Sequence, residues 1–520
     1  MKNIVLGLVF ASVAAAAPCG QMASFLPKGS TVTTSEEVTG GEVTLLGKPV
    51  RGLPSFCRVA GSLHPTADSD IRFEVWLPAT GWNGKFHGVG NGGFAGVINY
   101  TGLVDAVKHN YATASTDTGH DQTENTNASW ALNHPEKIID FGYRGIHETA
   151  LAAKSLIQGY YGEAPKKSYF SSCSNGGRQA LMEAQRYPAD YDGIIAGAPA
   201  YDWTHLLSAA GRSLRMMLGD PGAYFGPKKL PAIQVAALEQ CDASDGVKDG
   251  VIENPSACRF NPSVLLCKGE ESDACLTAAQ LKAVSNIYQP LQDARGRVIF
   301  PGMAFGGEAE QGGWASWITG TEPEKGAAIF GFATNFFKYI VYSDPSWSYK
   351  TFDLARDLAL ADKRAGAQLN ATSTDLSAFQ KRGGKLLLYH GWSDAAIPGG
   401  STVKYYDEVV AKLGKKTSDD FLRLYMVPGM GHCAGGSSAS TFGQAGTPNG
   451  DRFHSIDAAL EAWVEQSQAP DTLIASKLKN PGDPNSAVLR TRPLCPWPQV
   501  AKYKGAGSTD EAANFTCAKP

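Results

Sequence analysis

The chain of 520 residues is long enough to bury a large core, and its 43% apolar and 19% charged residues are typical of a globular protein. Its formal net charge is −3 and it has no run of basic residues, so nothing in its electrostatics favours binding to nucleic acid or to an anionic membrane surface. We therefore expect neither class of partner.

The N-terminal segment 1–17 has the pattern of a secretory signal peptide. A lysine at position 2 is followed by an apolar stretch and then by a run of alanines. A first core strand or a membrane anchor is the alternative, but the apolar stretch is shorter than the roughly 20 residues that span a bilayer. We predict cleavage near Ala15 to Ala17 and secretion to the cell exterior or the periplasm.

The segment 18–200 alternates between strands and helices. Apolar runs predict strands at 70–78, 84–90, 110–116, 166–173 and 191–197, and amphipathic patterns predict helices at 142–162 and 175–187. Strands that are separated by helices indicate a mostly parallel sheet with helices on both faces.

The alternation of strands and helices stops between 201 and 378, where short helical segments and irregular loops contain four of the cysteines. It returns in 379–520, with predicted strands at 384–391 and 421–427 and predicted helices at 401–413 and 455–466. We interpret the chain as one α/β core, interrupted by a large insertion that can cover the site as a lid.

A candidate nucleophile lies in the turn that begins with Ser172, where the chain reads "SCSNGG". Ser174 stands between a predicted strand and a predicted helix, which is the setting of the G-x-S-x-G nucleophile elbow. Gly176 fits that pattern, whereas Ser172 replaces the first glycine. An ordinary turn with a serine that caps the helix is the alternative.

A serine hydroxyl needs an oriented base to become a nucleophile. His432 follows the apolar strand "FLRLYMV" and Asp394 follows the strand "KLLLYHG", so both lie at the carboxyl ends of strands, where open α/β sheets hold their sites. The chain order Ser174, Asp394, His432 is that of α/β-hydrolases. We predict that these three residues form a catalytic triad.

The oxyanion of an acyl-transfer intermediate needs preorganised N–H donors. We expect one from the backbone of Asn175, which follows the nucleophile, and another from Gly92 or Gly93 in the glycine-rich loop "GNGGFAG". A phosphate-binding loop is the alternative, but no lysine followed by serine or threonine comes after these glycines.

Ten cysteines behind an export signal indicate disulfides. Cys173 directly precedes Ser174 and Cys433 directly follows His432. A Cys173–Cys433 bridge would hold nucleophile and base together, because bonded cysteines have Cα atoms within about 7 Å. These two cysteines could instead pair elsewhere. Close spacing makes three local pairs plausible: Cys241–Cys258, Cys267–Cys275 and Cys495–Cys517.

These motifs resemble those of the tannase and feruloyl esterase family of α/β-hydrolases. The resemblance rests on "CSNGG" at 173–177, "HGWSD" at 390–394 and "GMGHC" at 429–433. It implies an α/β-hydrolase core with a lid insertion, a disulfide beside the triad, and a Cys19–Cys57 bridge. The family includes feruloyl esterases, tannases and a bacterial hydrolase of mono(2-hydroxyethyl) terephthalate.

The insertion contains the acidic stretch "CDASDGVKDGV", which offers the hard oxygen ligands that Ca²⁺ prefers. A surface turn rich in aspartate and glycine is the alternative, but by resemblance the stretch corresponds to the lid calcium site of the family. We expect a structural calcium ion away from the chemistry and no organic cofactor. Its expected ligands are the side chains of Asp242, Asp245 and Asp249 and the backbone carbonyls of Val247 and Val251.

The insertion is also rich in aromatic residues, most of which we expect in the core and a few of which could stack on an aromatic acyl group. They are Trp314, Trp317, Phe330, Phe332, Phe336, Phe337, Tyr339, Tyr342, Trp347 and Tyr349.

Together these features predict a serine esterase that forms an acyl-enzyme on aromatic-acid esters. Hydroxycinnamates are the first choice, then gallates, then a terephthalate monoester. A catalytically inactive protein that binds phenolics or carbohydrates, and an acyltransferase on the same fold, are the alternatives.

Overall fold

The computed structural model describes residues 17–444, 450–480, 483 and 486–520. The predicted signal peptide therefore lies outside the described residues, apart from Ala17, whose N–H donates to the carbonyl of Gly159 at 3.1 Å. Among the described residues, no helix has both the length and the apolar character needed to cross a bilayer.

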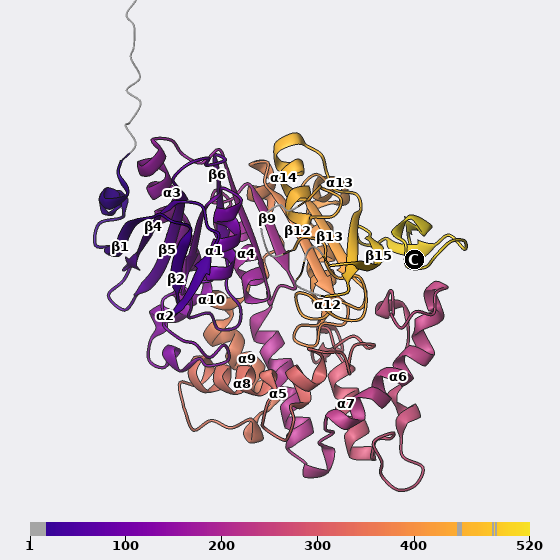
Figure 1. Ribbon diagram of the computed structural model, residues 1–520. Helices are drawn as coiled ribbons and strands as arrows, with labels where there is room; N and C mark the ends of the chain where they lie inside the picture. The colour runs from indigo at the N-terminus through magenta and orange to yellow at the C-terminus, as the bar shows by residue number, and fades with distance from the viewer. Residues whose placement is uncertain (1–16, 445–449, 481–482, 484–485) are drawn as a thin grey trace, which may run out of the picture.

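A nine-stranded sheet forms the centre of the molecule (Figure 1). The strand order is β1 (Thr31–Val38), β4 (Phe56–Leu63), β5 (Ile71–Pro78), β7 (Ala112–Thr116), β6 (Lys85–Val89), β8 (Lys167–Cys173), β9 (Gly193–Gly197), β12 (Lys385–Gly391) and β13 (Leu422–Val427). The first four strands in this order pair antiparallel. The last six, from β7 to β13, pair in parallel, as predicted.

Helices cover both faces of this sheet because its strands carry apolar residues on both sides. On β9, Ile194 and Ala196 pack into one core cluster and Ile195 packs into another on the opposite face. The first cluster includes residues of α3 (Gly145–Tyr161), α4 (Asn175–Arg186) and α12 (Gly399–Leu413), and the second includes residues of α1 (Tyr100–Lys108) and α14 (Ile456–Gln466).

The chain between β9 and β12 adds no strand to the nine-stranded sheet, and every residue of this segment is described. It corresponds to the predicted insertion, and its helices gather at one end of the sheet (Figure 1). Its main elements are α5 (Trp203–Leu218), α6 (Leu230–Cys241), α7 (Ala278–Tyr288), β10 (Leu291–Gln292), β11 (Val298–Phe300), α8 (Ala328–Asn335), α9 (Leu354–Ala361), α10 (Ala367–Leu369) and α11 (Ser377–Lys381).

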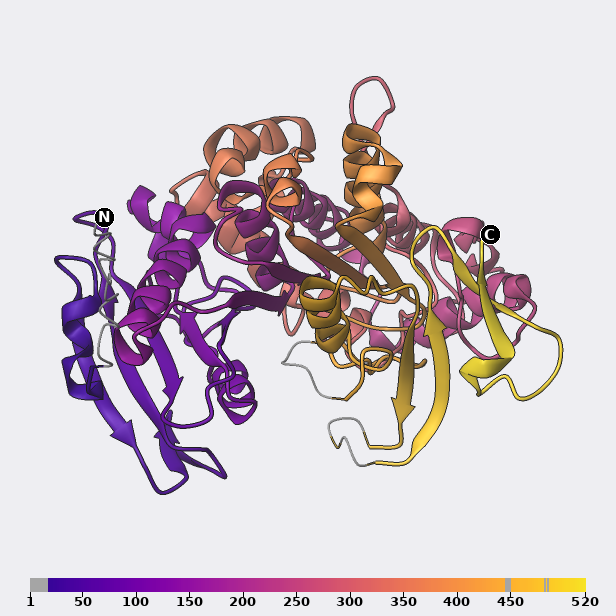
Figure 2. The same ribbon diagram turned by 90° about the horizontal axis from the view of Figure 1, so that it is seen from above.

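The C-terminal residues form two small antiparallel sheets outside the nine-stranded sheet, a division that the sequence did not predict. Figure 2 shows them (yellow) at the opposite end of the molecule from the N-terminal strands (indigo). The pairs are β14 (Leu473–Leu478) with β15 (Val488–Leu494), and β16 (Val500–Tyr503) with β17 (Phe515–Ala518). The remaining strands form the hairpin β2 (Glu42–Leu45) with β3 (Lys48–Arg51), and the remaining α-helices are the short α2 (Pro135–Ile139) and α13 (Lys415–Asp419).

Five disulfides join all ten cysteines. The three local pairs that close spacing favoured are formed, and so are the two long-range bridges. The pairs are Cys19–Cys57, Cys173–Cys433, Cys241–Cys258, Cys267–Cys275 and Cys495–Cys517.

Candidate active site

Ser174 occupies a tight turn between β8 and α4, with φ +66° and ψ −125°. This backbone conformation is costly for a residue with a side chain and is typical of a nucleophile elbow. Small neighbours make the turn possible. A Cβ on Gly176 would lie 1.9 Å from the Ser172 hydroxyl, and a Cβ on Gly177 would lie 2.3 Å from the carbonyl oxygen of Gly197.

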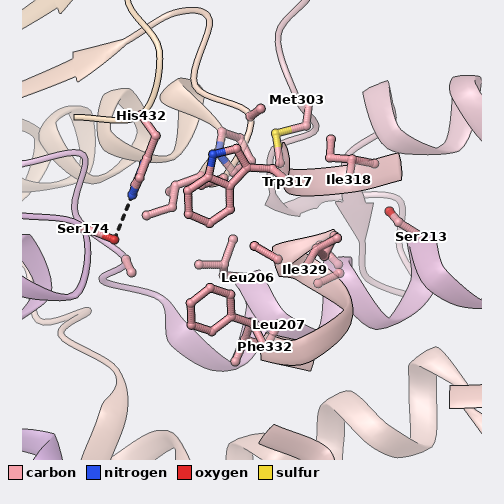
Figure 3. Close-up of a pocket in the computed structure, with 18 of the residues that line it drawn as sticks. Ser174, Leu206, Leu207, Ser213, Met303, Trp317, Ile318, Ile329, Phe332 and His432 are labelled. Carbon is pink, nitrogen blue, oxygen red and sulfur yellow. Dashed lines mark hydrogen bonds between the residues drawn. The ribbon is translucent and has the colours of Figure 1, made fainter. Parts of the chain in front are cut away.

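A chain of two hydrogen bonds connects the three predicted triad residues. The Ser174 hydroxyl lies 2.9 Å from Nε2 of His432, as the dashed line in Figure 3 shows. Nδ1 of His432 lies 2.8 Å from Oδ2 of Asp394. Because a carboxylate only accepts, Nδ1 carries the proton and Nε2 is free to accept the serine proton.

Asp394 is completely enclosed and remains ionised. Its Oδ1 accepts hydrogen bonds from the backbone N–H groups of Ala396 at 2.8 Å and Ile397 at 2.9 Å. Burial opposes the charge, but the interaction with His432 and the hydrogen bond from His390 outweigh it and hold the pKa of Asp394 well below its usual range. The carboxylate is therefore a fixed negative charge behind the imidazole.

His390 is a second histidine on Asp394, and the sequence did not assign its role. Its Nε2 lies 3.2 Å from Oδ2 of Asp394 and 3.0 Å from the carbonyl oxygen of Ile397, so Nε2 must be the donor. Its Nδ1 then accepts from the hydroxyl of Thr402 at 2.7 Å. His390 is fully buried and is packed behind the acid.

The disulfide between Cys173 and Cys433 links the two loops that carry nucleophile and base. Its Cα atoms are 5.9 Å apart, and it joins positions separated by 260 residues. The neighbouring residues Ser174 and His432 thereby reach hydrogen-bond distance, as the sequence analysis anticipated.

The predicted oxyanion donors, Gly92, Gly93 and Asn175, line the pocket that contains the nucleophile Ser174. Among the residues that the structure describes, the backbone N–H groups of these three donate to no other group. Gly93 has φ +56°, and a Cβ there would lie 2.6 Å from the carbonyl oxygen of Asn125, so this position requires glycine.

Sequence reasoning missed the side chain that fixes the glycine loop to the nucleophile helix. The carboxamide of Gln179 on α4 accepts from the N–H of Asn91 at 3.0 Å and donates to Oδ1 of Asn91 at 3.0 Å. The preceding residue, the buried Arg178, donates from Nε to Oδ1 of Asn175, about one helical turn earlier on α4, at 2.8 Å. These bonds set the spacing between the two sources of oxyanion donors.

A pocket of about 410 Å³ opens beside Ser174 and His432. Figure 3 shows apolar side chains from several elements pointing into it. Trp317 contacts the imidazole of His432 edge-on, with ring centroids 4.9 Å apart, and stacks parallel to Phe332 at 6.3 Å. Other apolar residues of the lining include Trp203, Leu206, Leu207, Ala210, Ile287, Phe300, Met303, Ile318, Ile329 and Ile397.

Only two of the ten aromatic residues that the sequence singled out line this pocket, namely Trp317 and Phe332. Five others are buried in core clusters and the remaining three pack against a core cluster. The five are Trp314, Phe336, Phe337, Trp347 and Tyr349. The apolar residues of α5 that line the pocket gave no sequence signal that distinguishes them from core residues.

The acidic loop of the insertion follows α6. The buried Asp242 accepts hydrogen bonds from the N–H groups of Asp249 at 3.1 Å and Gly250 at 3.0 Å. Oδ2 of Asp249 accepts from Nη1 of Arg490 at 3.0 Å and from Nη2 of Arg492 at 2.5 Å. The loop is therefore fixed to β15, and one of its three carboxylates is already paired with arginines.

Comparison with known proteins identifies the family of this chain. A family model described as tannase and feruloyl esterase matches residues 57–518. An uncharacterized esterase of Xanthomonas campestris is 41% identical over 537 residues, which cover 98% of this chain and 93% of that protein.

Two solved structures have similar folds. The crystal structure of feruloyl esterase B from Aspergillus oryzae is 30% identical, covers 96% of this chain and 99% of its own, and has a TM-score of 0.87. Tannin acyl hydrolase from Aspergillus niger is 22% identical, covers 96% of this chain and 94% of its own, and has a TM-score of 0.74. The second likeness concerns the fold alone.

Proposed function

Because the chain belongs to the tannase and feruloyl esterase family and is a carboxylic ester hydrolase with an α/β-hydrolase fold, we propose that it acts on esters of aromatic acids, with feruloyl and related hydroxycinnamoyl esters preferred. The observation that carries this proposal is the hydrogen-bonded Ser174, His432 and Asp394 at the mouth of an apolar pocket. The rings of Trp317 and Phe332 supply flat apolar surfaces there for an aromatic acyl group.

In the first half of the reaction, Ser174 attacks the ester carbonyl while Nε2 of His432 takes the hydroxyl proton. Asp394 stabilises the imidazolium that forms. The carbonyl oxygen becomes an oxyanion, which the N–H groups of Asn175 and of Gly92 or Gly93 stabilise. The intermediate collapses, His432 protonates the leaving alcohol, and the acyl group remains on Ser174.

In the second half, a water molecule takes the position of the alcohol. His432 removes its proton as the water attacks the acyl carbonyl, and a second oxyanion forms in the same donor set. Collapse of this intermediate releases the acid and returns the proton to Ser174.

A rate panel tests this proposal. Purified protein should hydrolyse methyl ferulate faster than methyl gallate or a terephthalate monoester, measured as kcat/KM under identical conditions. Ser174→Ala should lower kcat by about 10,000-fold or more, because the residual rate over water then comes from binding and the oxyanion donors alone.

Ser171→Ala is the matched control. Ser171 lies on β8, is buried, and lies outside the pocket lining. This variant should keep at least a large part of the wild-type rate. A preference for methyl gallate would contradict the proposed substrate class, and full activity in Ser174→Ala would contradict the mechanism.

We further propose that the acidic loop of the insertion holds a structural calcium ion. The pKa of Asp245 is raised by burial and by the nearby carboxylates of Asp249 and Asp242, a repulsion that a cation would relieve. Within the described part of the chain, the carbonyl oxygens of Val247 and Val251 accept no hydrogen bond, so they are available as ligands. The three carboxylates and two carbonyls would hold the ion and stiffen the insertion.

Metal removal tests the calcium proposal. Calcium added to metal-stripped protein should raise the melting temperature. At a calcium concentration a hundred times Kd, the free energy of unfolding should increase by about 3 kcal/mol. Asp245→Asn should weaken the response, whereas Asp273→Asn, at an exposed aspartate of the same insertion, should not. An equal response in both variants, or none in the wild type, would count against the site.

We also infer that the protein is exported. Its N-terminal sequence and its five disulfides support this inference, because disulfides persist in oxidising compartments.

A further inference from the structure

The pocket extends along α5. Leu206, Ala210 and Ser213 line it and are spaced by four and three residues, so they share one face of the helix. From Leu206 to Ser213 the helix rises by about two turns, or ~11 Å. Figure 3 shows Leu206 near Ser174 and Ser213 at the far side of the pocket. The cavity is therefore elongated and has an end that is distant from the nucleophile.

The pocket lining is mostly apolar on this side, with Ile287, Met303 and Ile318 among the residues of the lining. Arg212, the neighbour of Ser213 on α5, also lines the pocket, but its two Nη atoms already donate to the carbonyl oxygens of Pro290, Asn286 and Gln289, and its Nε is buried. Ser213 is only 8% exposed, and its hydroxyl points into the pocket (Figure 3). Within the described part of the chain, this hydroxyl makes no hydrogen bond to protein, although a helical serine can usually bond to a carbonyl of the preceding turn. It is therefore free to bond to a ligand.

We propose that Ser213 is a specificity residue that hydrogen-bonds to a para-hydroxyl group on the aromatic ring of the acyl moiety. This inference rests on the proposed function, which places the acyl carbonyl at Ser174. A para-hydroxycinnamoyl group has a two-carbon spacer between carbonyl and ring, which carries its phenol toward the distal end. A phenol buried there without a partner would lose its hydrogen bonds to water.

Shorter acyl groups cannot use this contact. In a galloyl or hydroxybenzoyl ester, the ring is bonded directly to the carbonyl carbon. Its hydroxyl groups would then lie closer to Ser174 and would not reach the hydroxyl of Ser213 at the far side of the pocket. Ser213 thus distinguishes acyl groups both by length and by the substituent at the far end.

The test compares two pairs of esters that differ by one hydroxyl group. Methyl 4-hydroxycinnamate and methyl cinnamate form the long pair, and methyl 4-hydroxybenzoate and methyl benzoate form the short pair. The wild type should prefer the hydroxylated long ester by about three- to tenfold in kcat/KM, the usual effect of one neutral hydrogen bond. Ser213→Ala should abolish that preference and leave the ratio within the short pair unchanged.

Ser208→Ala is the matched control on the same helix. Ser208 is fully buried, its hydroxyl is unpartnered, and it does not line the pocket. It should keep the wild-type preference. Since alanine is favourable in a helix, both variants are expected to fold. A rate on methyl cinnamate close to that of the wild type would show that each variant is folded.

The outcomes separate the two claims. An unchanged preference in Ser213→Ala, or no preference in a wild type that hydrolyses these esters, would overturn the role of Ser213 and leave the proposed function intact. Failure of the wild type to hydrolyse any of the four esters would overturn both.

Discussion

At the scale of single residues, the chemistry depends on how Asp394 is enclosed. Two backbone N–H groups and two histidines surround this one carboxylate, so it has no freedom to turn away from His432. His390 in turn is fixed by Thr402. The base therefore meets Ser174 in a single orientation and a single tautomer before substrate arrives, which is the preorganisation that catalysis requires.

A residue outside the triad gives a pH-dependent prediction for stability. His205 on α5 lies 2.8 Å from a carboxylate oxygen of Asp202 and 3.4 Å from one of Asp362. Burial opposes its positive charge, but these two carboxylates outweigh burial and raise the pKa of His205 to about 9. Because the folded pKa is raised, the stabilisation is complete below the unfolded pKa near 6.5 and is lost as the pH rises through about 9.

Melting temperatures of the wild type and His205→Gln check this. At pH 6 the variant should be less stable by on the order of 1–2 kcal/mol, and this difference should shrink above pH 9. His454→Gln, which removes an exposed imidazole that also lies beside an aspartate, Asp451, is measured in parallel as the control for loss of a surface ion pair. Parallel pH profiles for the wild type and His205→Gln would refute the assignment.

The triad residues could be predicted from the sequence, but their supports could not. Ser174, Asp394 and His432 each follow an apolar strand within a recognisable motif. His390 and Gln179 act through hydrogen bonds to particular atoms, and Gln179 bonds to a residue 88 positions away. No periodicity or spacing indicates such a contact, because it arises only when the sheet brings the two loops together.

At the scale of elements, the parallel strands and the antiparallel strand β5 were predicted from the sequence, whereas the antiparallel strands β1 and β4 were not. Strands β8, β9, β12 and β13 have apolar runs that are buried on both faces. Strand β1 reads "TVTTSEEV" and is largely exposed at the edge of the sheet, so it lacks the apolar run from which other strands were predicted.

Local departures from the α-helix also escaped prediction. The turn that carries Trp317 is π-helical and directs this indole against His432. Such turns often occur at functional sites, because the extra residue re-aims a side chain. The π-helical segments are Asp140–Arg144, Ala315–Thr319, Phe336–Val341 and Asp362–Gly366.

At the scale of the whole molecule, the site is assembled from two distant parts of the chain. Ser174 belongs to the part before the insertion, and Asp394 and His432 belong to the part after it. The sheet aligns these parts through the pairing of β9 with β12, and the Cys173–Cys433 disulfide joins them covalently. By the chain-entropy estimate, closing so long a loop contributes about 5 kcal/mol at most to stability.

The central claim is that this disulfide positions His432 against Ser174, and kcat on methyl ferulate in a variant without it tests that claim most directly. Cys173→Ala/Cys433→Ala, assayed at a temperature where it remains folded, should lose about ten- to a hundredfold in kcat, because small misplacements of catalytic groups are costly. Cys267→Ala/Cys275→Ala removes a disulfide of the insertion that joins positions only eight residues apart, and this variant should keep most of the wild-type kcat. A folded Cys173→Ala/Cys433→Ala variant with wild-type kcat would contradict the account.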